Sequence, residues 1–204
     1  MALIMEKHQL NKPLAILAFC GSLRKNSFNR MALDALQVRS PAGVDIHISE
    51  TLGDLPFFNP DLELALEKGR KQAFNVSDDS INALEKLRLE LSKADGLIIA
   101  SPEYAHGVTG LIKNTLDWLV SGESFINLPV MLVNTSARAS HAQASLHEII
   151  QTMSANIIDG TALTLPLLGS QVTSISQLLE SDLVDQIDAS LLFFCDKVIT
   201  LKYS

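Results

Sequence analysis

The sequence is poor in the features by which several protein classes are recognised. Its 204 residues contain two cysteines, Cys20 and Cys195, and neither belongs to a C-x-x-C pair. This excludes a disulfide framework and fits a reducing cytoplasm, where we expect the protein. No apolar stretch approaches the roughly 20 residues that a membrane-spanning helix needs. The apolar run Leu14–Phe19 is shorter than the roughly 7–15 residues of a signal-peptide core, so we interpret it as a strand.

Basic residues are also scarce. The chain has 16 Lys and Arg against 23 Asp and Glu, which gives a formal net charge of −7. Such a chain is repelled by nucleic acid and by anionic membranes, and no basic run interrupts the pattern, so we expect neither as a partner. Any site for an anion must therefore be local.

Glycine-rich phosphate fingerprints are missing as well. None of the 10 glycines forms a G-x-G-x-x-G pattern, and no G-K-[ST] occurs. The first absence excludes the usual dinucleotide fingerprint, and the second excludes a P-loop.

What the sequence does contain is an alternation of apolar runs with helical patterns. The five runs that predict strands are Leu14–Phe19, Val44–Ser49, Asp95–Ser101, Leu128–Ser136 and 156–165. Val44–Ser49 alternates apolar and polar residues, which is typical of a half-exposed edge strand. The fifth run, "NIIDGTALTL", is treated as one continuous strand.

Helical spacing separates these strands. After the first strand, Met31, Leu33 or Asp34, Ala35 and Val38 are expected on one helix face. The stretch "SINALEKLRLELSKA" predicts the next helix, with its cap within Asp78–Ser80. "GLIKNTLDWLV" and "SHAQASLHEIIQTMSA" predict two more, and a last helix is expected near Leu183–Val198.

Strands alternating with helices predict an α/β fold with a doubly wound parallel sheet. We expect a single domain over residues 1–204 with five strands in the flavodoxin-like order 2-1-3-4-5. Residues 1–12 form an N-terminal tail in this scheme, and residues 52–79 form an irregular excursion that is mobile or forms an interface. Ligands of such sheets bind outside the carboxyl ends of the strands where the strand order reverses, here between strands one and three.

The loop after the first strand, "GSLRKNSFN", offers groups that bind phosphate. Gly21 permits a tight turn, and Arg24 supplies a planar fork for bidentate contact. Ser22, Ser27 and Asn29 offer hydrogen-bond donors, and the backbone amides of the following helix start add positive potential. The alternative is a plain Ser/Asn-capped helix with an exposed arginine.

The loop after the third strand, "SPEYAHGVTG", is the second unusual stretch. Pro102 fixes a rigid turn, and Glu103 and Tyr104 follow at the carboxyl end of the strand. Such a backbone suits the edge of a flat heterocycle, although a turn with a surface tyrosine is the simpler alternative. Because the two loops flank the expected switch point, they favour a shared ligand.

At these residues the sequence resembles the NADPH-dependent FMN reductase family, which includes quinone, azo-dye and chromate reductases. "GSLR..S.N" is similar to the phosphate loop of that family, and "SPEYAHGVTGLIKNTLDWL" resembles its segment "PEYN.s.pG.lKNaiDW". "LPFFNPD" resembles the apolar loop that follows strand two in the family. The likeness covers most of Leu14–Leu165.

The resemblance implies a non-covalent FMN reduced by NADPH or NADH, and electron transfer to a quinone, flavin, azo compound or metal oxyanion in ping-pong order. An alternative is a flavin-binding electron carrier or redox sensor with little turnover, and a non-flavin module on the same fold is a more distant one. The cofactor performs the redox chemistry, so we name no catalytic acid or base and no metal site. The expected cofactor-binding residues are Ser22, Arg24, Ser27, Phe28, Asn29, Pro102, Glu103, Tyr104, Ala105, His106, Ser136 and Arg138.

The sequence departs from the family pattern at three places. Ala105 stands where Asn is common, and Thr109 stands where Pro is usual. The loop after strand four, "NTSARASHA", lacks the glycines that relatives often carry there. We hypothesise that Arg138 of this loop lies near the pyrimidine edge of the flavin and stabilises its anionic reduced form, the alternative being a solvent-facing arginine.

The resemblance also implies a homodimer or homotetramer with flavin sites at the subunit interface. We expect "GDLPFFNPD" and the helix from Gly110 to make the contact, with Phe57 and Phe58 as exposed apolar side chains. Trp118 and Leu119 belong either to the core or to this interface.

Overall fold

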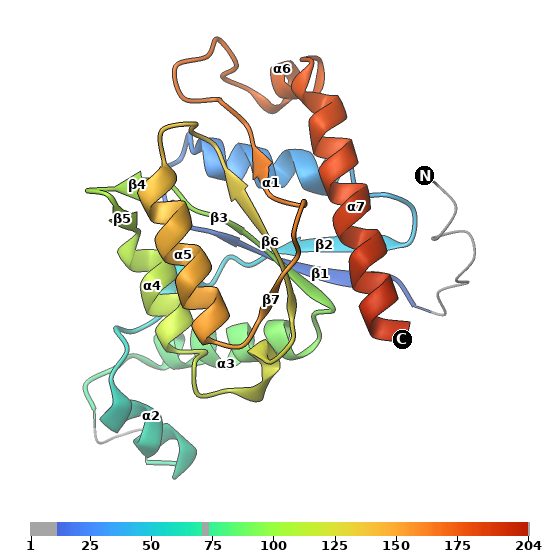
Figure 1. Ribbon diagram of the computed structural model, residues 1–204. Coiled ribbons are helices and arrows are strands. Elements are labelled where there is room, and N and C mark those ends of the chain that lie inside the picture. The colour runs from blue at the N-terminus through green and yellow to red at the C-terminus, as the bar shows by residue number, and fades with distance from the viewer. Residues whose placement is uncertain (1–11, 71–73, 204) are drawn as a thin grey trace.

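A parallel sheet lies between two layers of helices (Figure 1). The computed structural model describes residues 12–70 and 74–203. The sheet has the order β2-β1-β3-β6-β7, with β8 also paired to β6. Its strands are β1 (Leu14–Cys20), β2 (Val44–Ile48), β3 (Gly96–Ala100), β6 (Pro129–Asn134), β7 (Asn156–Ile157) and β8 (Leu163–Thr164). Counted along the sheet, this is the predicted order 2-1-3-4-5, so the flavodoxin-like fold class is confirmed.

Two apolar clusters fill the spaces between the sheet and its helices. α1 (Phe28–Val38), α6 (Ile175–Leu179) and α7 (Leu183–Tyr203) pack on one face of the sheet. α3 (Asp78–Ser92), α4 (Gly110–Asp117) and α5 (Ser140–Thr152) pack on the other (Figure 1). All five residues of β3 are buried, as expected for a central strand covered on both faces, whereas burial alternates along the edge strand β2.

The predicted fifth strand is not continuous. It is split into β7, which pairs with Pro129 and Val130, and β8, which pairs with Val133 and Asn134. Between them Asp159 and Gly160 form a turn, with Gly160 at a φ of +79°. Asp-Gly is a favoured turn sequence because glycine adopts this left-handed backbone without a steric penalty. The prediction of one unbroken strand over 156–165 was therefore wrong.

Three helix predictions also need correction. In α1 the helix buries Leu33 and Leu36, and Val38 is 62% exposed instead of facing the core. α3 is capped by Ser77, whose side chain accepts from the backbone N–H of Ser80, and not by a residue within 78–80. α7 continues to Tyr203, beyond the expected end. Among the helices of residues 12–70 and 74–203, none has the length and apolarity to cross a bilayer.

The excursion after β2 contains a helix, α2 (Pro60–Glu67), and is fastened to α4 at its start. Asn114 donates to the carbonyl of Pro56 at 3.0 Å and accepts from the N–H of Phe58 at 2.8 Å. Trp118 donates to the same Pro56 carbonyl at 2.7 Å. Trp118 is fully buried, and the ring of Phe58 packs edge-on against it at 5.1 Å. Of the two phenylalanines predicted to be exposed, only Phe57 is, at 89%.

Residues 71–73 of the excursion and residues 1–11 of the predicted N-terminal tail lie outside the described residues.

Candidate functional site

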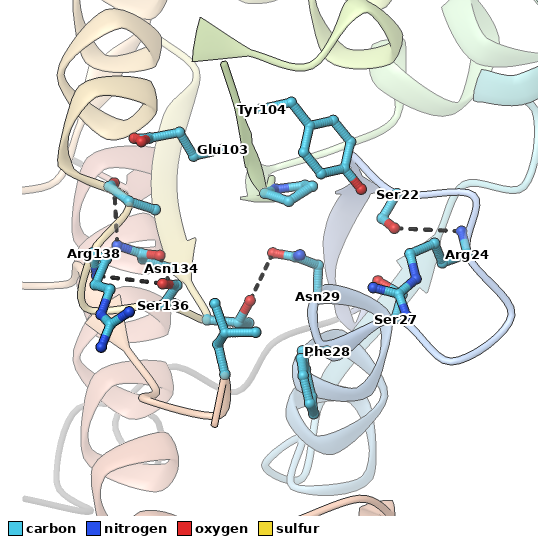
Figure 2. Close-up of a pocket in the computed structure, with 14 residues that line it drawn as sticks. Ser22, Arg24, Ser27, Phe28, Asn29, Glu103, Tyr104, Asn134, Ser136 and Arg138 are labelled. Carbon is cyan, nitrogen blue, oxygen red and sulfur yellow. Dashed lines mark hydrogen bonds between the residues drawn. The ribbon is translucent and has the colours of Figure 1, made fainter. Parts of the chain in front are cut away.

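A cleft opens at the carboxyl ends of β1, β3 and β6, where the sheet order reverses (Figure 2). Its cavity measures about 260 Å³. Three loops line it, one from each strand, together with a single residue from the segment after β8. The lining residues are Ser22, Arg24, Ser27, Phe28, Asn29, Pro102, Glu103, Tyr104, Asn134, Thr135, Ser136, Arg138, Ala139 and Leu168. The two loops selected from the sequence therefore face one cleft, as predicted.

Gly21 packs the first loop directly against the second. Its N–H donates to the carbonyl of Ala100 at 2.7 Å. A Cβ at this position would lie 2.7 Å from Oγ and 2.9 Å from Cα of Ser101, and 2.8 Å from a side-chain carbon of Ile112. The backbone of Gly21 is not in the left-handed region, so glycine is required here by close approach and not by the tight turn that the sequence suggested.

The hydroxyl groups of the first loop hold the loop in shape and can still donate. Oγ of Ser27 accepts from the N–H of Arg30 at 3.2 Å and caps α1, which explains where that helix begins. Oγ of Ser22 accepts from the N–H of Arg24 at 3.4 Å. In both cases the oxygen uses a lone pair, so its own proton is available for a ligand anion.

Arg24 of this loop and Arg30 of α1 have different surroundings. Arg30 forms ion pairs with Asp34 at 2.8 Å and with Glu50 at 2.7 Å. The hydrogen bond that Arg30 donates to the carboxylate of Asp34 is the main reason why the pKa of Arg30 is raised. Arg24 lines the cleft, and its guanidinium has no ion pair with any side chain of the described residues. Arg24 is therefore a cation of the first loop that both lines this cleft and remains available for an anion.

Asn29 joins the first loop to the third. It is buried, at 4% exposure, and its Oδ1 accepts from the hydroxyl of Thr135 at 3.3 Å (Figure 2). This contact uses only Oδ1, so the two amide protons of Asn29 remain available to a ligand in the cleft. Thr135 was not expected at the site: it lies within the fourth predicted strand, Leu128–Ser136, but directly follows the observed strand β6.

The second loop is a short hairpin formed by β4 (Glu103–Tyr104) and β5 (Gly107–Val108). Its two turn residues, Ala105 and His106, have φ values of +49° and +59°. These values fit a type I′ turn, in which Asn is better tolerated than Ala at a left-handed position. This is a physical reason why Asn would suit position 105 better than the Ala105 of this chain. The two residues form the tip and do not line the cavity, unlike Pro102, Glu103 and Tyr104.

The carboxylate of Glu103 is bound to the first turn of α5. Its Oε2 accepts from the N–H of Ala142 at 2.8 Å, and its side chain is only 14% exposed. The helix needs this acceptor because its own capping position is Ala139, which has no side-chain oxygen. A charge-assisted hydrogen bond contributes about 1.5–3 kcal/mol. Glu103 thus fastens the second loop to the helix that follows the third.

The third loop has no glycine and is held by short-range hydrogen bonds. Oδ1 of Asn134 accepts from the N–H of Ser136 at 2.9 Å, and Oγ of Ser136 accepts from the N–H of Arg138 at 3.3 Å. The N–H of Ala139 donates to the carbonyl of Ser136 at 3.0 Å. Arg138 lines the cleft, and its guanidinium has no ion-pair partner in the described part of the chain. The loop is therefore stabilised by hydrogen bonds among its own residues.

Four lining residues were missed from the sequence: Asn134, Thr135, Ala139 and Leu168. The first three lie in or next to the loop after β6, so their position in the sequence was a usable signal. Leu168 comes from the segment after β8 and is 63% exposed. Only the path of the chain brings it to the cleft, and no local pattern marks it.

The thiol of Cys20 lies under the first loop and is buried, at 8% exposure. Its Sγ donates to the carbonyl of Ser22 at 3.4 Å. Burial raises the pKa of this thiol above its ordinary value, which keeps it protonated at neutral pH. Cys20 therefore packs as a buried, protonated thiol under the first loop.

Two separate comparisons relate the chain to known proteins. The family model for NADPH-dependent FMN reductase matches residues 14–166. A quinone reductase of Escherichia coli (strain K12) is 26% identical over 155 residues, which are 74% of this chain and 76% of that protein. An NAD(P)H-dependent FMN reductase of Pseudomonas aeruginosa is 28% identical over 141 residues, 68% of this chain and 69% of that protein.

Solved structures show the same fold. A flavoenzyme NAD(P)H:(acceptor) oxidoreductase from Paracoccus denitrificans superposes with a TM-score of 0.66 at 20% identity. The superposition covers 88% of this chain and 96% of that one.

Proposed function

The chain belongs to the NADPH-dependent FMN reductase family, and from this premise we propose that it passes electrons from NADPH or NADH, through FMN, to a quinone, flavin, azo compound or metal oxyanion by a ping-pong mechanism. The family makes it an oxidoreductase that uses FMN and a nicotinamide nucleotide. The identity of the acceptor and the order of the half-reactions belong to the proposal. The observation that supports it best is that the first loop and the hairpin of the second loop line one shared cleft.

The donors of the first loop fit a phosphate monoester. The guanidinium of Arg24 has no ion pair within the described residues, and Ser22, Ser27 and Asn29 each have a side-chain proton to donate. These groups surround the start of α1, whose backbone amides favour an anion. We assign the phosphate of FMN to them, with Phe28 packing beside it. In a chain of net charge −7, this local set supplies the attraction that the protein as a whole does not.

The rest of the cleft fits a flat ring system. Tyr104 lies on one side of it, and Ser136 and Arg138 lie on the other (Figure 2). Pro102 also lines the cavity. When bound there, FMN supplies the redox chemistry by taking up a hydride and delivering electrons to an acceptor. The protein's own groups bind and orient. Tyr104, 54% exposed at the mouth, leaves that side open for a nicotinamide and then for an acceptor.

Arg138 is assigned to the pyrimidine edge of the ring, where its charge stabilises the anionic reduced form. Its free guanidinium supports this assignment, because a positive group without a carboxylate partner keeps its full effect on a nearby negative charge. Potentiometry of Arg138→Ala tests it: we expect a lower midpoint potential, and an unchanged potential would refute the assignment.

Spectra and kinetics of the purified protein test the proposed function as a whole. We expect a flavin absorption spectrum, bleaching on anaerobic addition of NADPH or NADH, and reoxidation by a quinone such as menadione. Steady-state rates at several fixed quinone concentrations should give parallel double-reciprocal lines, as a ping-pong mechanism requires. Converging lines would reject that mechanism. Rapid bleaching without sustained turnover would favour an electron carrier or sensor.

We also propose that the protein is a cytoplasmic homodimer or homotetramer. The excursion offers an apolar surface, since Phe57 is 89% and Leu64 of α2 47% exposed. Trp118 and Leu119 are buried within one chain and belong to its core, so they are not available for this contact. Sedimentation of the wild type and of Phe57→Ser distinguishes the possibilities, and an oligomer unaffected by the substitution would place the interface elsewhere.

A further inference from the structure

The structure assigns to Glu103 a positioning role: its carboxylate fixes the distance between the two loops that flank the flavin ring, and does not itself bind the flavin. This inference rests on the proposed function, because it concerns the same cleft. It starts from an unusual feature of α5, a helix whose first turn takes its capping acceptor from a residue 39 positions earlier in the chain.

The first step is the local requirement at the start of α5. Ala139 occupies the capping position without a side-chain hydrogen bond, and the first turn contains no acidic residue. The N–H groups of a first helical turn need acceptors. Oε2 of Glu103 meets this need at the N–H of Ala142, which is itself buried at 2% exposure. The position of this helix end is therefore tied to the hairpin.

The second step is a further contact between the same two elements. Oε1 of Glu103 lies 3.9 Å from Nδ1 of His106, across the hairpin turn. The ring of His106 meets the ring of His141, in the first turn of α5, at 4.5 Å in an edge-on arrangement. The carboxylate and the two rings thus hold the hairpin against the helix at more than one point.

The third step connects the helix start to the cleft. Ala139 ends the third loop and begins α5, and both Ala139 and Arg138 line the cavity. The loop is braced by the hydrogen bonds from Ser136 and Arg138 to side chains of the loop itself. Because it contains no glycine and is internally bonded, we expect it to move with the helix start as one piece. Figure 2 shows Glu103 and Arg138 on the same side of the cleft, away from Arg24.

Removal of the carboxylate should therefore widen or shift the cleft around the ring while leaving the phosphate loop intact. Misplacement of a reacting group by about 1 Å can cost roughly 100-fold in rate. For Glu103→Ala we expect flavin reduction by NADPH or NADH at saturating FMN to slow by about 10- to 100-fold. We also expect a shifted flavin absorption spectrum and an FMN dissociation constant within about threefold of wild type, a change below 1 kcal/mol.

Two substitutions separate the hydrogen bond from other effects. Glu103→Gln keeps an oxygen that can accept from the N–H of Ala142, so its flavin reduction should stay close to wild type. Glu103→Asp keeps the charge but shortens the side chain, so it should resemble Glu103→Ala. The aspartate variant also serves if the alanine variant does not fold.

Ser77→Ala is the matched control, because it removes the capping hydroxyl of α3, a helix that does not line the cleft. It should lower the unfolding temperature without slowing flavin reduction. Equal slowing in Ser77→Ala would show a general effect of lost stability and would overturn the inference. It is also overturned by a Glu103→Ala variant with wild-type kinetics, by a glutamine variant as slow as alanine, or by a large loss of FMN affinity, which would make Glu103 a flavin ligand. A wild-type protein that binds no FMN or is not reduced by either nucleotide would instead refute the proposed function.

Discussion

The substitution Gly21→Ala tests the packing of the two cleft loops most directly. The added methyl group would lie 2.7 Å from Oγ and 2.9 Å from Cα of Ser101, and 2.8 Å from a carbon of Ile112. Carbon atoms in contact are normally about 3.5–4.0 Å apart. One of the three contacts is to backbone, so rotation of a side chain does not relieve all of them, and the first loop must move away from β3.

The magnitude follows from two opposing effects. Overpacking of a tightly packed site costs about 1–3 kcal/mol, and the backbone contact places Gly21→Ala in the upper part of that range. Replacing glycine by alanine recovers about 0.4–1 kcal/mol by restricting the unfolded chain. We therefore expect a net loss of about 2 kcal/mol in the free energy of unfolding. For a domain of this size this corresponds to roughly 4–8 °C in unfolding temperature.

Urea and thermal unfolding, followed by the fluorescence of buried Trp118, provide the assay. Gly110→Ala is the matched control, because a Cβ at Gly110 would meet no atom within 4 Å. This control should be neutral or slightly stabilising. Because the displaced loop carries Arg24 and Ser22, Gly21→Ala should also bind FMN about 10-fold or more weakly. Equal stability of the two alanine variants would refute the argument from close approach.

The other predictions concern single groups. Arg24→Ala should weaken FMN binding by about 10- to 150-fold, which is the equivalent of one charge-assisted hydrogen bond of about 1.5–3 kcal/mol. Hydride transfer should stay nearly normal at saturating FMN. A large loss of the hydride-transfer rate in the FMN-loaded variant would contradict this prediction. Trp118→Phe removes one of the two hydrogen bonds to the carbonyl of Pro56, the one from Asn114 remaining, and should cost about 0.5–1.5 kcal/mol in unfolding experiments. An unchanged midpoint would show that the excursion is not fastened there. Burial raises the pKa of the Cys195 thiol from 9.0 to about 12, so the folded state favours the neutral thiol more than the unfolded chain does. The resulting contribution to the free energy of unfolding is complete below pH 9.0 and falls as the pH rises toward 12. The slope is about 1.4 kcal/mol per pH unit, and Cys195→Ala should lose this component when urea unfolding is compared at pH 8 and 11.

Much of the site could be predicted from the sequence because its parts are local. The loops after the first and third strands contain unusual polar residues, and parallel strands bring their carboxyl ends to one edge of the sheet. Ten of the twelve predicted cofactor-binding residues line the cavity, and the two that do not are Ala105 and His106. Their left-handed backbone places them at the hairpin tip, a consequence of turn geometry that the residue types alone did not reveal.

The sequence by itself determined the alternation of strands with helices and the two loops that line the cleft, because hydrophobic periodicity and loop chemistry act over a few neighbouring residues. Only the tertiary structure decided how these loops are joined. The steric limit at Gly21, the bond between Asn29 and Thr135, and the cap that Glu103 provides to α5 each connect segments far apart in the chain. The same holds for Leu168, which the chain path alone brings to the cleft. Such contacts require segments to be positioned to within a few tenths of an ångström, and no pattern along the sequence encodes these positions.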